Sequence, residues 1–117
     1  MESLEALVAD WLTLPDIADH LGLNISRVHR LIEDRQLIAV RVGDPEVRRV
    51  PAAFLGDGEP VPSLRGTLML LHDAGYSDAE SIAWLFTADE TLPGRPIDQL
   101  REGRKAEVRR RAQALAF

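Results

Sequence analysis

The sequence predicts a mainly α-helical protein that carries one short β-hairpin, and three observations indicate this fold class. Apolar residues recur at helical spacing in several segments of the chain. Residues 38–42 instead alternate apolar and polar side chains, and a turn then leads into a second β-rich run. A stretch rich in glycine, proline and acids, residues 55–63, separates two helical regions. We therefore expect an N-terminal domain at 1–54, a linker at 55–63 and a helical C-terminal domain at 64–117.

Composition limits the class of protein. A chain of 117 residues with a 45% hydrophobic share is expected to form one domain, or one small domain with an appendage. There is no cysteine, which excludes disulfides and thiolate metal sites. No segment reaches the roughly 18 apolar residues that a membrane span needs. The start MESLEALVADWL has acids where a signal peptide would have bases, so we expect a cytoplasmic protein.

Two helices are expected in the first 22 residues. The first has a helical stripe made of Leu4, Leu7, Val8, Trp11 and Leu12, with Ser3 as a candidate N-cap. A second helix is predicted to start at Thr13, because Thr13 and Asp16 can form a capping box and Pro15 suits a first helical turn. Gly22 is expected to end this helix.

A third helix is predicted at about 24–34. Asn24 is a good N-cap, and one apolar face is expected to hold Ile25, Val28, Leu31 and Ile32. Two helices joined by a few residues that include a glycine are typical of a helix-turn-helix.

After the third predicted helix, the spacing of apolar residues changes from helical to alternating. Ile38, Val40 and Val42 alternate with Ala39 and Arg41, the string GDPE is turn-like, and VRRVP is β-rich until proline ends it. A hairpin of this size directly after a helix-turn-helix indicates a wing at 38–50.

More helices are expected after the linker. Ser63 is a candidate cap for a helix that Gly75 stops, and Ser77 with Glu80 can form a capping box for the next one. After a further loop, the chain ends in a basic helix whose apolar stripe holds Val108, Ala112 and Leu115.

The net charge of −5 conceals two basic windows. Residues 24–51 hold six arginines against four acids, and residues 101–117 hold six bases against two acids. Residues 1–23 hold five acids and no lysine or arginine. Because nucleic-acid affinity depends on where cations lie, these two windows are the candidate DNA contacts. The alternative is that both are ordinary solvated faces.

The third helix is predicted to enter the major groove of DNA, N-terminal half first, with its wing on the backbone or in the minor groove. A helical wheel places Ser26, Arg27, His29 and Arg30 outward; in the wing, Arg41, Arg48 and Arg49 are candidates. Arg48 and Arg49 are strand neighbours that face opposite sides, so we expect Arg41 and one of them to bind. Glu33 and Asp34 would repel phosphate unless the helix enters tip first. The alternative is a two-helix packing unit with surface arginines.

The second basic window offers secondary candidates, namely Arg104, Lys105, Arg109 and Arg110. Their cations could equally complement the dipole of a solvated helix.

Motifs for catalysis or metal binding are absent from the sequence. The three histidines show no metal-ligand spacing, and there is no phosphate loop, dinucleotide fingerprint or nucleophile elbow. We expect a protein that is not an enzyme and that needs no cofactor or metal.

The stretch WLTLPDIADHLGLNISRVHRLIEDRQLIAVRVG is similar to the winged helix-turn-helix of MerR-like and excisionase-type proteins. The resemblance covers about residues 11–51. It implies a DNA-binding transcriptional regulator. One departure is Arg35, which stands where that family usually has glycine. A left-handed backbone at this position would cost an arginine on the order of 1 kcal/mol.

The second half resembles a small actinobacterial family of DNA-binding proteins with a helical C-terminal domain. Within it, AWLFTADETLPGRPIDQLREG resembles the toxin-binding domain of Xre–MbcA–ParS-type antitoxins. These resemblances imply double-stranded DNA as partner, in the nucleoid, with a homodimer or a protein partner of the C-terminal domain as further expectations. Two alternatives stay open, an antitoxin-like protein-binding module and an architectural or excisionase-type factor that bends DNA.

Overall fold

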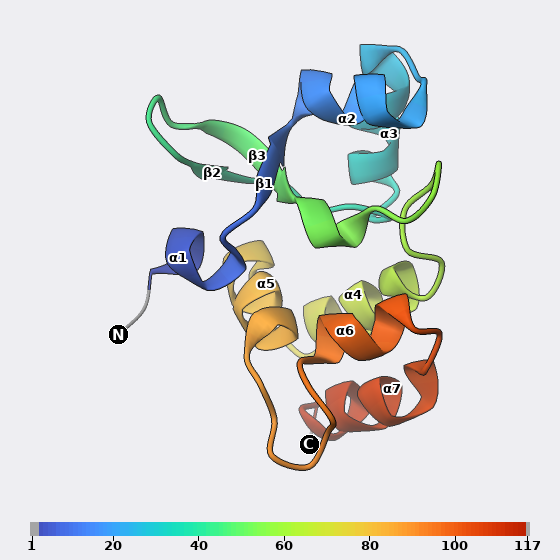
Figure 1. Ribbon diagram of the computed structural model, residues 1–117. Coiled ribbons are helices and arrows are strands. Elements are labelled where there is room, and N and C mark those ends of the chain that lie inside the picture. Colours follow the sequence, from blue (N-terminus) through green and yellow to red (C-terminus); the bar gives the residue numbers. More distant parts are fainter. Residues whose placement is uncertain (1–2, 117) are drawn as a thin grey trace.

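The computed structural model describes residues 3–116, which form several helices and one small three-stranded sheet at one side of the molecule (Figure 1). The N-terminal half contains α1 (Leu4–Val8), β1 (Trp11–Thr13), α2 (Leu14–Leu21), α3 (Ile25–Glu33), β2 (Val40–Val42), β3 (Val47–Pro51) and the 3-10 turn η1 (Ala52–Phe54). The C-terminal half contains α4 (Leu64–Asp73), α5 (Asp78–Phe86), α6 (Pro96–Arg101) and α7 (Lys105–Ala114). This is the expected winged helix-turn-helix followed by a helical region.

The helix-turn-helix is fixed by its caps. The Thr13–Asp16 capping box is formed at the start of α2, and Gly22 ends that helix with a φ of +68°. A left-handed turn of this kind suits glycine, which has no Cβ to clash. The side chain of Asn24 accepts a hydrogen bond of 2.9 Å from the backbone N–H of Arg27 and thereby caps α3. The three predictions for this corner are confirmed.

The expected first helix is only partly correct. It ends at Val8, and Trp11, Leu12 and Thr13 form a strand that pairs with β3. Ala9, with a φ of +69°, breaks the helix, and the backbone N–H of Ala52 donates to the carbonyl of Asp10. The order of the antiparallel sheet is therefore β1-β3-β2, with β3 in the middle.

The C-terminal half packs its helices beneath this unit. On α7, Val108 and Ala112 are buried as expected, whereas Leu115 lies after the helix and is 36% exposed. The capping box of Ser77 and Glu80 is formed, and its hydrogen bonds lower the pKa of Glu80. Ser63 makes no side-chain cap, so that prediction is wrong, because its backbone is already helical.

The two halves share one hydrophobic core cluster. It runs from Val28 and Leu37 through Phe54 to Leu68 and Ile82. Two buried residues of the expected linker, Leu55 and Val61, belong to this cluster. The ring centroids of Phe54 and Phe86 are 5.8 Å apart, and the side chain of Arg101 donates to the carbonyls of Ala53 and Leu55 at 2.7 Å each. Among residues 3–116, no helix has the length and apolar character to cross a bilayer.

Candidate nucleic-acid interface

The outward face of α3 carries the residues predicted for it. Ser26, Arg27, His29 and Arg30 are all exposed. Val28, on the opposite face, is fully buried and holds α3 in the core. The helical period therefore orients these side chains as expected. Ser26 and Arg27 lie in the first turn of α3, where the unpaired N–H groups of a helix favour anions, whereas Arg30 already belongs to its last turn.

Ile25 departs from the prediction. It was expected on the buried face, yet it is 43% exposed, more than any other large apolar residue among those that the structure describes. The physical reason is its position directly after the cap Asn24, because the first helical residue lies at the tip, beyond the body that Val28 packs against. The position of Ile25 on a helical wheel does not by itself reveal this exposure.

The wing brings two arginines together. Arg41 on β2 pairs directly with Arg48 on β3, so both side chains lie on the same face of the hairpin, and both are exposed. Arg49 points to the opposite face, as the alternation of strand side chains predicts. Its guanidinium folds against Gly43 in the wing turn and donates a hydrogen bond of 3.2 Å to the carbonyl of Pro45. Figure 1 shows this hairpin reaching away from the body of the molecule.

The C-terminal end of α3 is occupied by contacts with the second half. The backbone of Arg35 is left-handed, with a φ of +59°, and its guanidinium pairs with Asp78 of α5 at 3.0 Å. Arg65 of α4 donates from Nε to the backbone carbonyl of Asp34 at 2.9 Å. Of the two ends of this helix, the N-terminal one is therefore available to a ligand. Neither Arg65 nor Asp78 was predicted from the sequence, since both contacts depend on the tertiary packing of the two halves.

Four arginines on α3 and the wing carry charges that no described residue of the protein neutralises. The guanidinium groups of Arg27, Arg30, Arg41 and Arg48 make no hydrogen bond or ion pair with any residue from 3 to 116. Most other arginines do contact protein acceptors; these are Arg35, Arg49, Arg65, Arg95, Arg101, Arg104, Arg110 and Arg111. Unneutralised cations on neighbouring elements form a surface that suits an extended anion.

A groove of about 470 Å³ lies between α3 and the wing. We call it the helix–wing groove, and its walls are Thr13, Leu14, Pro15, Ile25, His29, Val47 and Arg48. Its most exposed apolar side chains are Ile25 and Val47, the latter 37% exposed. At its α2 edge, hydrogen bonds from Thr13 lower the pKa of Asp16, which keeps this capping carboxylate ionised.

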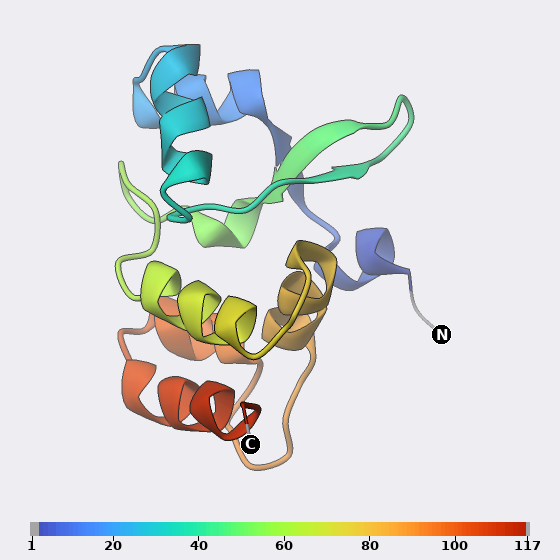
Figure 2. The ribbon, with the colours of Figure 1, turned by 180° about the vertical axis from the view of Figure 1, so that it is seen from behind.

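The second basic window lies at the far end of the molecule. Figures 1 and 2 show α7 on the opposite side of the C-terminal half from α3 and the wing. Lys105, Arg109 and Arg110 belong to α7 and Arg104 directly precedes it, so these candidates are not brought together with the arginines of α3 and the wing, and their contact with DNA stays a prediction. Arg109 is half-buried with its guanidinium against Gly66 of α4, and Arg104 lies 3.7 Å from a carboxylate oxygen of Glu102.

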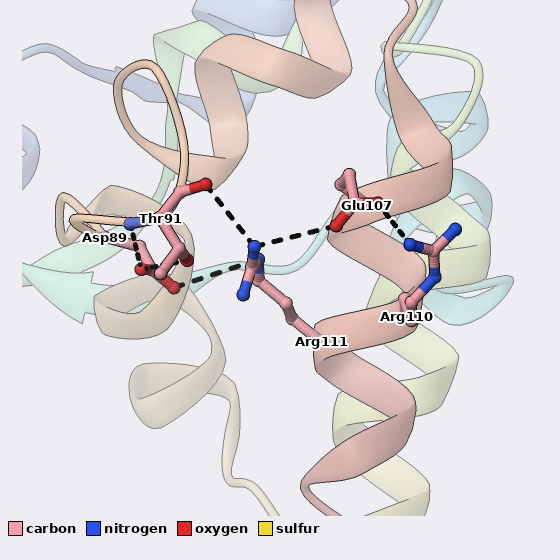
Figure 3. Close-up of polar contacts among 5 residues, drawn as sticks. All are labelled: Asp89, Thr91, Glu107, Arg110 and Arg111. Atoms are coloured by element: carbon pink, nitrogen blue, oxygen red, sulfur yellow. Dashed lines mark hydrogen bonds and ion pairs between the residues drawn. The ribbon is translucent and has the colours of Figure 1, made fainter.

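Other charges of α7 are paired within the protein (Figure 3). Arg110 pairs with Glu107, and Arg111 reaches from Glu107 to the carboxylate of Asp89 and the carbonyl of Thr91. Hydrogen bonds from Thr91 lower the pKa of Asp89, with a smaller contribution from Arg111. This network fastens the loop between α5 and α6 to α7.

Comparisons with known proteins agree with this architecture. The family described as "DNA-binding protein Rv2175c, wHTH domain" matches residues 3–55, and the "Rv2175c C-terminal domain of unknown function" matches residues 61–116. The DNA-binding protein Rv2175c of Mycobacterium tuberculosis is 38% identical, over 89% of this chain and 79% of that protein. The NMR structure of Rv2175c superposes with a TM-score of 0.82 at 37% identity, covering 92% of this chain and 81% of that one. The chain belongs to the Rv2175c family of winged helix-turn-helix proteins with a helical C-terminal domain.

Proposed function

We propose that this chain binds double-stranded DNA in a sequence-specific manner and acts as a transcriptional regulator. The observation that carries the proposal is the group of four arginines, on α3 and the wing, that have no protein partner among the described residues. Membership of a family named for a DNA-binding protein supports the same partner. The finer likenesses, to MerR-like and excisionase-type proteins and to Xre–MbcA–ParS-type antitoxins, stay predictions.

The proposed geometry inserts the N-terminal half of α3 into the major groove. Arg27 and Arg30 then reach base edges, where a bidentate arginine–guanine pair contributes about 1–3 kcal/mol of discrimination. Arg41 and Arg48 lie on one face of the wing and contact backbone phosphates or the minor groove. Glu33 and Asp34 stay outside, because they lie at the end of α3 that faces the second half.

In this proposal, the protein regulates transcription by binding selectively to such sites on the chromosome. A two-fold dimer of the chain would bind half-sites about 34 Å apart, or a multiple of that distance, and the length of a selected site reports this directly.

The experiment compares Arg30→Ala and Arg41→Ala in the full chain. A duplex selected from a random-core library and an unrelated duplex serve as probes, with fluorescence anisotropy measured over a range of salt concentrations. Arg30→Ala is expected to weaken the selected duplex about tenfold or more and the unrelated duplex much less. Arg41→Ala is expected to weaken both and to flatten the logarithmic salt slope by about 0.9, the value for one lost phosphate contact.

Lys105→Ala is the matched control, because it removes an exposed cation at the far end of the molecule. It should leave both affinities and the salt slope unchanged. Equal losses on both duplexes for Arg30→Ala would reduce that residue to a phosphate contact. The absence of any duplex binding at low salt would contradict the proposed function.

A further inference from the structure

The helix–wing groove combines exposed apolar side chains with one exposed arginine, Arg48, in its wall. Ile25 is the first residue of α3 and Val47 the first residue of β3, and both line the groove while 43% and 37% exposed. Apolar surface left in water at such positions gains free energy when a ligand covers it. A cluster of this kind beside a charged face is typical of a binding surface.

One arginine lines this groove, and the three other arginines without a described partner lie elsewhere on the same two elements, which favours an anionic ligand that extends beyond the groove. Arg48 is part of the groove wall, its strand partner Arg41 lies on the same face of the wing, and Arg27 and Arg30 are exposed on α3. None of these four guanidinium groups is neutralised by another described residue. The inference rests on the proposed function, in which this end of α3 meets duplex DNA.

The chemistry of the major groove then indicates which group of the DNA an apolar side chain would contact. Base edges in that groove offer hydrogen-bond donors and acceptors, and only thymine adds an apolar group, its 5-methyl. An isoleucine at the helix tip matches this methyl and cannot satisfy the polar groups of the other bases. We infer that Ile25, with Val47 on the facing wall of the groove, contacts a thymine methyl and makes the protein prefer thymine at one position of its site.

Replacement of thymine by uracil isolates this contact, because uracil pairs identically and lacks only the methyl. A duplex selected from a random-core library is remade with deoxyuridine at each thymidine in turn, and its affinity for the full chain is measured. At one position we expect the wild-type affinity to fall about fourfold, the factor that burial of one such carbon group carries. Ile25→Ala should bind the thymine and uracil duplexes equally.

Two further variants complete the test. Leu115→Ala removes another exposed apolar side chain, distant from α3, and should keep the full sensitivity to uracil. Val47→Thr changes the opposite wall of the groove with little change in shape and should reduce the sensitivity, even if Ile25→Ala fails to fold.

The remaining outcomes overturn the inference. A selected site without thymine, an affinity that is unchanged at every uracil position, or an equal loss in wild type and Ile25→Ala would each do so. Binding of no duplex at all would instead contradict the proposed function and remove the inference with it.

Discussion

At the scale of single residues, Arg35 combines a strained backbone with an ion pair that offsets the strain. The sequence raised the question, because arginine stands where similar winged domains usually have glycine. The structure gives a φ of +59° at this position and an ion pair of 3.0 Å with Asp78. The pair is partly exposed, at 24% and 41% for the two side chains, so it contributes at most about 1 kcal/mol. Strain and ion pair are thus of similar size and offset each other.

Glycine and alanine at position 35 separate these two contributions. Arg35→Ala removes the ion pair and keeps the strain, whereas Arg35→Gly removes both. We therefore expect the glycine variant to have the higher free energy of unfolding, by on the order of 1 kcal/mol, in urea denaturation followed by circular dichroism. Asp78→Asn should destabilise the wild type more than either variant, because in the variants it removes only the favourable interaction of Asp78 with the first turn of α5. Equal stability of the two variants would show that Arg35 carries no backbone strain.

At the scale of elements, the sequence located helices through their ends. The capping boxes of α2 and α5 and the cap of α3 were predicted, because side-chain acceptors three residues before a free N–H act locally. The strand β1 was missed, since Trp11 and Leu12 fit a helical stripe as well as a strand. Only the pairing of β1 with β3 decides between the two, and that pairing joins segments about forty residues apart.

The candidate site was predictable to a similar degree. Helical period alone oriented Ser26, Arg27, His29 and Arg30 outward. The pairing of Arg41 with Arg48 could not be predicted, because it depends on the register of β2 on β3. The sequence of the turn alone does not specify that register. The exposure of Ile25 needed the position of the helix tip relative to the core.

The cap of α3 offers a test that separates folding from binding. Asn24→Ala removes the acceptor for the N–H of Arg27 and should cost about 1 kcal/mol of stability. Asn24→Asp keeps an acceptor and adds a negative charge that the helix dipole favours, so stability should hold or rise. The same charge faces incoming phosphate, and DNA affinity should fall on the order of fivefold. If Asn24→Asp binds a selected duplex as tightly as wild type, the tip of α3 does not approach phosphate.

At the scale of the whole molecule, the two ends of the protein differ in how far their charges are paired. A chain of net charge −5 presents four arginines, unpaired within residues 3–116, on α3 and the wing, while α7 at the opposite end holds much of its charge in internal pairs. Between them, Arg65 and Asp78 of the second half hold the C-terminal end of α3. The second half therefore supports the orientation of the proposed DNA-reading helix.

A shared core predicts that both halves unfold together. The chain has two tryptophans, Trp11 in β1 and Trp84 in α5, and both pack against the common cluster. In Trp84→Phe the fluorescence reports the N-terminal half, and in Trp11→Phe it reports the C-terminal half. Within each variant, we expect the urea midpoint of fluorescence to coincide with that of far-UV circular dichroism, because a single cooperative unit has one transition. A fluorescence midpoint displaced from the dichroism midpoint in either variant would instead make 64–117 an independent domain, joined to the winged domain through a true linker.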